Sequence, residues 1–302
     1  MICKSKINKD EHEDLTRSGK NFNDSDVDFF ENSAGDKIFS KYWIPEEGTI
    51  KGLVFIIHGF AEHCQRYDSF AKDLNSEGLM VFSHDHVLHG ENPGYFLEIT
   101  NYKQFIDDAK QHATLMKEKH PDLPMFLFGH SMGGCVSVFL VKDNPTLFNG
   151  LILSSPLLAP NAEFTPFKVA VAKRLYTWLP RFPVGILDPN QISSDKGQVK
   201  KYIDDPLIYN GRVNLQTALQ LYTMATEVQS CFNLISLPFL VQHGVADEIA
   251  LISLSRSLIE SSPSTDKLKV EFEGAKHELL HESGDIPETF ATNVKSWINK
   301  RI

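Results

Sequence analysis

A serine lies between two glycines in the pattern G-x-S-x-G at residues 129–133, where the sequence reads GHSMG. The apolar run Met125–Phe128 precedes this pattern, and the apolar, helix-like stretch Cys135–Val141 follows it. A chain that turns directly from a strand into a helix holds the serine in a strained conformation with its hydroxyl exposed, and the glycines leave room for that turn. The pattern therefore predicts that Ser131 is a nucleophile.

A serine hydroxyl attacks efficiently only when a base removes its proton, and an acid must hold that base in one tautomer. When the serine lies in G-x-S-x-G, the acid and then the histidine follow it along the chain. Asp247 and His277 each come shortly after a late apolar run that suits a strand, so we expect them to be the acid and the base. Glu248 and His281 are the alternatives for these two roles.

The tetrahedral intermediate of such a reaction carries an oxyanion, which needs N–H donors already in place. The backbone N–H of Met132, at the head of the helix after the serine, is expected to supply one donor. The backbone N–H of Phe60 is expected to supply the second, because the turn His58-Gly59 follows the early apolar run Leu53–Ile57. An ordinary structural turn is the alternative interpretation of that dipeptide.

Two histidine patterns are similar to zinc sites, but each lacks a required ligand. Residues 277–281 spell H-E-x-x-H, yet Pro287 stands where the extended zinc-protease pattern needs its third ligand, and no methionine follows Met224 to form a methionine turn. Residues 84–89, HDHVLH, carry Leu88 where a metal-hydrolase pattern needs aspartate. We therefore expect no metal, and expect the histidines at 84–89 to be hydrogen-bonded in a polar loop.

The elements that must position these residues alternate between short apolar runs and helical patterns. A hairpin, Val27–Phe30 with Ile38–Trp43, comes first. One helical pattern runs from Tyr102 to Met116 and is ended by Pro121, and another opens at Pro287. Strands that alternate with helices indicate an α/β fold with a mostly parallel central sheet. The expected buried strands are Leu53–Ile57, Met80–Ser83, Met125–Phe128, Leu151–Leu153, Phe239–Gln242 and Leu268–Phe272.

The alternation stops between residues 156 and 236, where prolines punctuate a mainly helical stretch without a clear strand. We interpret 156–236 as a helical cap inserted over the sheet between the core segments 25–155 and 237–302, and residues 1–24 as a flexible tail. Residues 162–182 contain four cations and one anion, a net charge of +3, around an apolar stripe. This composition suits an anionic lipid surface, and packing on the core is the alternative. The stripe consists of Phe167, Val171, Leu175, Trp178 and Phe182.

The overall composition, 42% hydrophobic and 23% charged, is typical of a soluble globular protein. A net charge of −9 argues against nucleic acid as a partner, because a polyanion needs a basic footprint. Four scattered cysteines without a C-x-x-C pair indicate a reducing compartment. The sequence shows no signal peptide, myristoylation glycine or membrane-spanning apolar run, so we expect a cytoplasmic protein.

With these residues assembled, the chain resembles monoacylglycerol lipases of the α/β-hydrolase superfamily from about Asp26 to the carboxyl end. The resemblance implies the α/β-hydrolase fold and hydrolysis of a monoacylglycerol to a fatty acid and glycerol without a cofactor. It also implies an acyl tunnel near the triad and a cap that makes transient, peripheral contact with membranes. The matching stretches lie within residues 58–67, 84–90, 123–134, 155–157 and 202–207.

The resemblance further implies a glycerol head-group pocket, and two positions depart from the family pattern. His281 lies one residue later than the family's second histidine, so carrying over a head-group role needs a gap. Phe60 replaces a smaller residue. A lysophospholipase or broad carboxylesterase would share the triad and differ in the head-group contacts, and a non-catalytic lipid-binding protein of this fold is the alternative of another class. The implied pocket consists of Glu62, Arg66, His130 and Tyr202.

Overall fold

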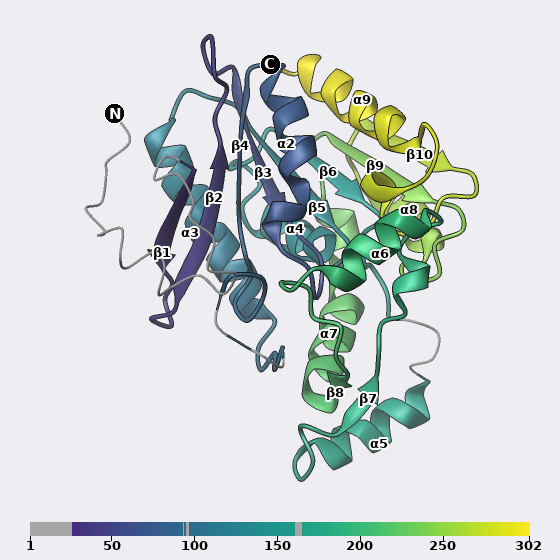
Figure 1. The fold of residues 1–302 in the computed structure, drawn as a ribbon. Coiled ribbons are helices and arrows are strands. Elements are labelled where there is room, and N and C mark those ends of the chain that lie inside the picture. Colours follow the sequence, from purple (N-terminus) through teal and green to yellow (C-terminus); the bar gives the residue numbers. More distant parts are fainter. Residues whose placement is uncertain (1–25, 93, 95–96, 161–164) are drawn as a thin grey trace.

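The computed structural model describes residues 26–92, 94, 97–160 and 165–302, so the tail predicted at 1–24 lies outside the described residues. An eight-stranded sheet in the order β1-β2-β4-β3-β5-β6-β9-β10 forms its centre (Figure 1). β2 pairs antiparallel with β1 and β4, and all other neighbours pair parallel, which confirms the predicted α/β architecture. The strands are β1 (Val27–Glu31), β2 (Lys37–Trp43), β3 (Gly52–Ile57), β4 (Leu79–His84), β5 (Met125–His130), β6 (Gly150–Ser154), β9 (Phe239–Gly244) and β10 (Lys267–Phe272).

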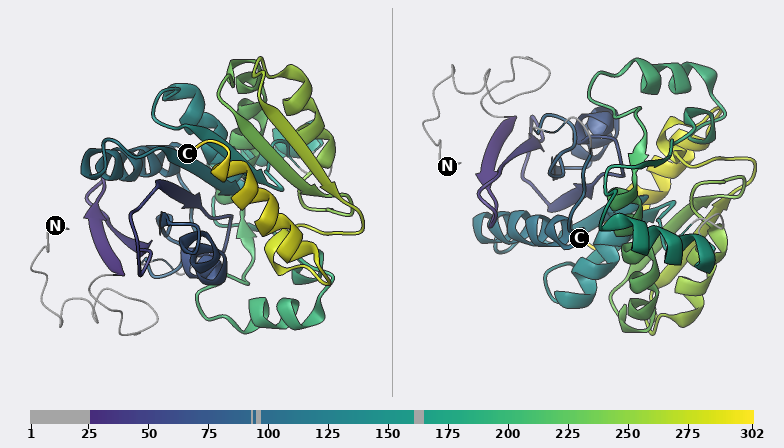
Figure 2. Two further views of the ribbon diagram at one scale, coloured as in Figure 1. Left: turned by 90° about the horizontal axis from the view of Figure 1, so that it is seen from above. Right: turned by 90° about the horizontal axis from the view of Figure 1, so that it is seen from below.

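Helices cover both faces of the sheet (Figure 2). Alternate side chains of the central strand β3 point to opposite faces. Leu53, Phe55 and Ile57 pack with α3, α4 and α8, whereas Val54 and Ile56 pack with α2 and α9. Because both faces are covered, the inner strands are apolar throughout, which is why their sequences revealed them. These helices are α2 (Asp68–Asn75), α3 (Lys103–Lys119), α4 (Met132–Asp143), α8 (Ile252–Ser261) and α9 (Ile286–Asn299).

The two helices that the sequence predicts most clearly are both present. α3 ends at Lys119, two residues before Pro121. α9 carries Pro287 in its first turn, where a missing N–H leaves no helical hydrogen bond unmade. Its buried face consists of Phe290, Val294, Trp297 and Ile298.

β10 was predicted as a buried strand, but in the structure it is mostly exposed or half-buried. It lies at the edge of the sheet and pairs only with β9. Leu268 is 48% exposed, and Phe272 is the one residue of the strand that is buried. The apolar residues at 268–272 suggested burial, but residues 267–272, KLKVEF, alternate between charged and apolar side chains. Such alternation is typical of a strand with one exposed face, unlike the continuous apolar runs of the inner strands.

Residues 156–236 are mainly helical, as expected, with α5 (Pro166–Tyr176), α6 (Lys196–Asp204) and α7 (Leu215–Glu227). They also contain β7 (Pro183–Gly185) and β8 (Val213–Asn214), which pair antiparallel, so the expectation of no strand there is wrong. Strands this short show no periodicity in a sequence. In Figure 1, α5, β7 and β8 lie at the lower end of α7, away from the large sheet. Two 3-10 helices complete this segment, η2 (Pro189–Gln191) and η3 (Val228–Leu234).

The apolar stripe predicted in this segment is on the surface. Trp178 is 83% exposed, Phe167 76% and Phe182 53%, so the alternative that the stripe packs on the core is wrong. Val171 and Leu175 are also exposed. Within the described ranges, no helix is long and apolar enough to cross a membrane.

A cluster of buried histidines lies beside β4 and α3. His84 Nδ1 and His112 Nδ1 are 3.1 Å apart, and His112 Nε2 lies 3.1 Å from the Tyr42 hydroxyl. One ring nitrogen of the histidine pair must lack a proton to accept from the other. Burial lowers the pKa of His84 to about 3 and holds the pKa of His112 well below its usual value. These rings are therefore neutral in the folded protein near pH 7.

The buried histidines make the free energy of unfolding depend on pH. Between about pH 6.5 and pH 3 an unfolded histidine is protonated while His84 is not, so the unfolded state holds more protons. The contribution of neutral His84 to the free energy of unfolding is therefore fully present above about pH 6.5. It falls by about 1.4 kcal/mol per pH unit as the pH is lowered from about 6.5 to 3. Urea unfolding at several pH values measures this slope. We expect His84→Leu to reduce the slope of the unfolding free energy against pH by the contribution of about one proton. An unchanged slope would contradict the inference that His84 is neutral in the folded state.

Candidate active site

Ser131 lies where β5 turns directly into α4. Its backbone φ of 51° and ψ of −118° place it in a region that serine rarely adopts. A Cβ on Gly129 would lie 2.4 Å from Ser137 Oγ, and one on Gly133 would lie 2.1 Å from the Ile57 carbonyl oxygen. Both separations are far inside van der Waals contact, so the two glycines of G-x-S-x-G are what allows the turn to close around the serine.

Asp247 and His277 come from the loops after the neighbouring strands β9 and β10. Since these strands pair in parallel, their carboxyl ends meet at one edge of the sheet. His277 Nδ1–H donates to Asp247 Oδ2 over 2.8 Å. The loops approach closely because Gly244 has no side chain: a Cβ there would lie 2.1 Å from the Lys276 carbonyl oxygen.

Four N–H donors hold the buried Asp247 carboxylate. Its Oδ1 accepts from the backbone N–H groups of Ile249 and Ala250, at 2.8 and 3.0 Å. Its Oδ2 accepts from His277 and from His243 Nε2–H, the latter over 3.1 Å. Burial alone would raise the pKa of Asp247, but the His277 ring and the hydrogen bonds from both histidines hold it below its usual range. The acid is therefore ionised, as a carboxylate that orients a base must be.

His277 has the electrostatics of a base. Burial would lower its pKa, but the charge and hydrogen bond of Asp247, followed by the charges of Glu278 and Glu62, outweigh burial and raise it. The ring of His130 lies 4.8 Å from that of His277, centroid to centroid. Burial, together with His277, lowers the pKa of His130 to about 4, so His130 stays neutral beside His277.

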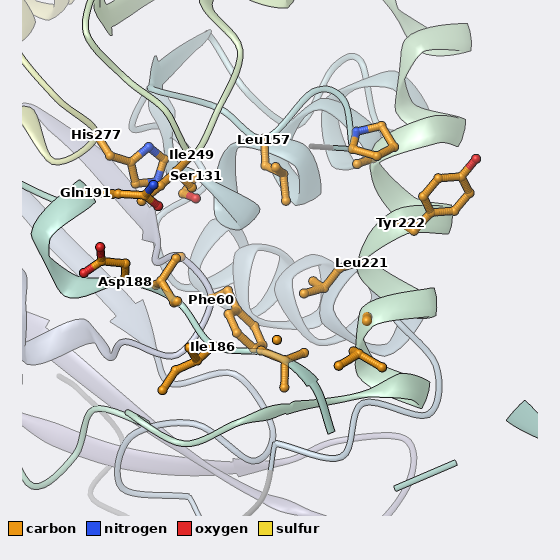
Figure 3. A pocket seen from close by; sticks show the side chains of 18 of the residues that line it. Phe60, Ser131, Leu157, Ile186, Asp188, Gln191, Leu221, Tyr222, Ile249 and His277 are labelled. Atoms are coloured by element: carbon orange, nitrogen blue, oxygen red, sulfur yellow. The ribbon is translucent and has the colours of Figure 1, made fainter. Parts of the chain in front are cut away.

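Ser131 and His277 line one end of the same cavity (Figure 3). Since Nδ1 of His277 is bonded to Asp247, its Nε2 is the nitrogen that remains to accept the serine proton. The structure thus brings the three predicted residues together. The alternatives have other partners: Glu248 accepts from Gln191, and His281 Nδ1 lies 3.2 Å from Glu278 Oε2.

The two predicted oxyanion donors lie beside the serine. Met132 is the first residue of α4, and N–H groups at a helix start have no partner within the helix. In the part of the chain that the structure describes, neither the Met132 nor the Phe60 backbone N–H donates to a protein acceptor. Gly59, next to Phe60, packs against Ser131, since a Cβ there would lie 3.2 Å from Ser131 Cβ.

Glu62 holds the loop that carries Phe60. Its Oε1 accepts from the Gly59 N–H over 2.5 Å and from the Tyr67 hydroxyl over 2.8 Å. Its Oε2 accepts from Arg66 Nη1 over 2.8 Å. Burial would raise the pKa of Glu62, but Arg66 and other neighbours lower it, so this carboxylate is ionised.

Arg66, in the 3-10 helix η1 (Cys64–Tyr67), joins this loop to the loop of His277. Its two terminal nitrogens donate to the two oxygens of Glu278, each over 2.6 Å, and Glu278 directly follows His277. The Tyr202 ring lies over the guanidinium, 5.0 Å from its central carbon. Glu278 was not predicted as part of the site, although it is the glutamate of the H-E-x-x-H pattern at 277–281.

The four residues of the implied head-group pocket are gathered in one place. Glu62, His130 and Tyr202 line the main cavity with Ser131. Arg66 instead lines a second cavity of about 10 Å³, which Glu62 and His130 also border. Its guanidinium nitrogens are already bonded to Glu62 and Glu278.

Two hydrogen bonds join the loop after β3 to the loop after α6. His63 Nε2 lies 3.0 Å from Asp205 Oδ2, and the Tyr209 N–H donates to the Ala61 carbonyl oxygen over 3.0 Å. Ala61 and His63 flank Glu62 in sequence. The segment 156–236 is therefore attached to the same loop that carries Phe60.

The main cavity measures about 570 Å³ and extends from Ser131 between the core and residues 156–236. Figure 3 shows Leu157 near Ser131 and Leu221 and Ile186 further along it. Further apolar lining comes from α5 and α7. One end can thus hold a reacting ester and the rest an apolar chain.

Neither histidine pattern forms a metal site in the described residues, where no three His, Cys, Asp or Glu side chains are arranged to hold an ion. His277 is bonded to Asp247, and His281 lies in η4 (Leu279–His281) rather than on an α-helix with His277. The loop histidines bond to backbone: His86 Nε2 lies 3.2 Å from the His58 carbonyl oxygen and His89 Nδ1 3.0 Å from that of Val87.

Comparison with known proteins agrees with this arrangement. Residues 48–284 match the family model described as serine aminopeptidase, S33. Rat monoglyceride lipase is 36% identical over 95% of this chain and 94% of its own length, and human monoglyceride lipase is 35% identical over 91% of each. The crystal structure of Paleococcus ferrophilus monoacylglycerol lipase is 28% identical, with a TM-score of 0.76 over 88% of this chain and 99% of that one. The chain belongs to the serine aminopeptidase S33 family of α/β-hydrolases and, within it, to the monoglyceride lipases.

Proposed function

We propose that the chain is a serine esterase that hydrolyses monoacylglycerols to a free fatty acid and glycerol. The observation that carries the proposal is the position of Ser131 and the His277–Asp247 pair at the polar end of a long, mainly apolar cavity. The names of the relatives support the same substrate.

The proposed reaction uses only groups of this chain. His277 Nε2 takes the hydroxyl proton as Ser131 Oγ attacks the ester carbonyl, and ionised Asp247 stabilises the resulting imidazolium. The N–H groups of Phe60 and Met132 hold the oxyanion. Collapse breaks the ester bond, and His277 returns the proton to the departing glycerol oxygen. Water, activated by His277 in the same way, then releases the fatty acid from the serine.

The charges at the polar end favour an uncharged head group. Arg66 contributes one positive charge, and the ionised Glu62 and Glu278 contribute two negative ones, a net charge of −1. A lysophospholipid phosphate would meet this net negative charge and find the guanidinium already paired. Glycerol hydroxyls carry no such charge. This balance favours a monoacylglycerol lipase over the alternative lysophospholipase.

The segment 156–236 is, in this proposal, a cap over the active site that also meets the lipid surface. It lies across the cavity from the core, and its exposed Phe167, Trp178 and Phe182 lie among Lys168, Lys173, Arg174 and Arg181. Ala162 and Glu163, at the start of the basic stretch, lie outside the described residues. Apolar side chains framed by cations suit peripheral contact with an anionic bilayer.

Removing the nucleophile tests the reaction. Ser131→Ala should lower ester hydrolysis by about 10,000-fold, since no oxygen remains to attack, and His277→Ala should be comparably damaging. His281→Ala is the matched control and should retain most activity. A fluorophosphonate should label the wild type and not Ser131→Ala. Labelling elsewhere, or no labelling with unchanged fold, would favour a non-catalytic lipid-binding protein.

Tyr202→Phe tests the head-group end, because it removes only a hydroxyl at the cavity wall. If that hydroxyl pairs with glycerol, kcat/KM for a monoacylglycerol should fall about 5- to 100-fold while a p-nitrophenyl ester is spared. Tyr209→Phe is the matched control, since this tyrosine donates to the Arg212 carbonyl oxygen outside the cavity. Equal losses on both esters would contradict the head-group role.

Vesicle binding tests the proposed membrane surface. Phe167→Ser with Trp178→Ser should lower co-sedimentation with anionic vesicles about tenfold or more, because exposed aromatic area is lost from the interface. Hydrolysis of a short soluble ester should not change, since neither residue lines the cavity. Leu268→Ser, an exposed apolar residue on β10, is the control. Unchanged sedimentation of the double variant would refute this surface.

A further inference from the structure

A second histidine, His243, touches the acid of the proposed triad. His243 lies near the end of β9 and is fully buried. Its Nε2 is 3.1 Å from Asp247 Oδ2 and 3.0 Å from the Ala250 carbonyl oxygen. Its Nδ1 is 2.8 Å from Ser255 Oγ on α8. The ring thus fills the space between the acid loop and a helix of the core.

These contacts place a proton of His243 on Nε2. An ionised carboxylate and a carbonyl can only accept, so Nε2 must carry a hydrogen. The Ser255 hydroxyl holds Nδ1 on the other side of the ring. The surroundings therefore fix the ring with the Nε2–H pointing at Asp247.

The same Asp247 oxygen serves both histidines. Oδ2 accepts from His277 Nδ1 over 2.8 Å and from His243 Nε2 over 3.1 Å, while Oδ1 is occupied by two backbone N–H groups. A carboxylate with donors on both oxygens cannot rotate without breaking bonds in a buried site, where lost bonds are expensive. A second donor on Oδ2 also offsets part of the negative charge that His277 would otherwise feel.

We propose that His243 is a positioning residue for the reaction, which fixes the Asp247 carboxylate against His277 and limits how strongly that carboxylate raises the basicity of His277. This inference rests on the proposed triad. The other charged or titratable groups that face His277 are Glu278 and Glu62, which raise its pKa, and His130, which is neutral. In the described residues His243 bonds to Asp247, Ala250 and Ser255 and to none of these three, so we expect a change at His243 to act on His277 through Asp247.

The test compares His243→Leu, which loses the donor, with His243→Gln, whose amide can still donate to Asp247. Rates on a p-nitrophenyl ester are divided by the fraction of enzyme that a fluorophosphonate labels, so that only folded, reactive protein counts. His243→Leu should lower kcat about tenfold or more with little change in KM, because the base is less well oriented. The low-pH limb of kcat/KM should move to higher pH, because Asp247 would exert its full charge on His277 and the base would protonate earlier.

His243→Gln should restore most of kcat and return the limb toward its wild-type position. If the Leu variant does not fold, the comparison of Gln with wild type still decides, since the inference requires nearly wild-type values for it. His112→Gln, a buried histidine bonded to Tyr42 and His84, is the control and should lower stability without moving the limb. A limb that stays in place or moves to lower pH in His243→Leu, or a Gln variant as impaired as Leu, would overturn the inference. Ser131→Ala in the same assay separates this result from failure of the triad itself: if that variant keeps its activity, the proposed function is wrong.

Discussion

The ion pair between Arg66 and Glu278 is the interaction on which the arrangement of the site depends. It spans 212 residues of sequence and joins the loop after β3 to the loop after β10. Both partners are almost completely buried, at 8% and 6% side-chain exposure. Removing one partner of a buried pair leaves an uncompensated charge and costs about 3–5 kcal/mol. The same guanidinium thus holds together the loop of Phe60, the proposed oxyanion donor, and the loop of His277, the proposed base.

The parallel sheet brings these loops close together. β3, β5, β9 and β10 all end at one edge, so the loops that carry the chemistry start from a common line. At three glycines, these loops approach neighbouring segments more closely than a side chain would allow. Gly59 packs on Ser131, Gly133 on the end of β3 and Gly244 on the loop before His277. Substituting any of them would move a loop that carries a reacting group.

Sequence reasoning succeeded where the signal is local. The order Ser131, Asp247, His277 and their positions just after apolar runs predicted that they meet, because strand ends in a parallel sheet are adjacent. The inner strands were recognisable since both faces are buried. The exposed face of β10 is marked only by Lys267, Lys269 and Glu271, which alternate with its apolar residues, and the prediction of a buried strand did not account for them. β7 and β8 were too short to detect.

Contacts between residues that are distant in the sequence were not predictable, because no local pattern indicates the partner. The resemblance of the chain to the monoacylglycerol lipases implied that Arg66 binds the head group. In the structure the Arg66 guanidinium is bonded to Glu62 and Glu278. Nothing in the residues around 66 indicates a partner at 278. His243 lies only four residues before Asp247, but its hydrogen bond to Asp247 depends on how the intervening loop folds, which the sequence pattern did not indicate.

The bonds from His63 to Asp205 and from Tyr209 to Ala61 have a mechanical consequence. They attach the segment that covers the cavity to the short loop between Gly59 and Arg66, which is braced in turn by Glu62. Opening at this corner must either break both bonds or pull on the backbone that carries Phe60. Access to the cavity and the position of the proposed oxyanion donor at Phe60 are therefore mechanically coupled, and a displacement of either one shifts the other.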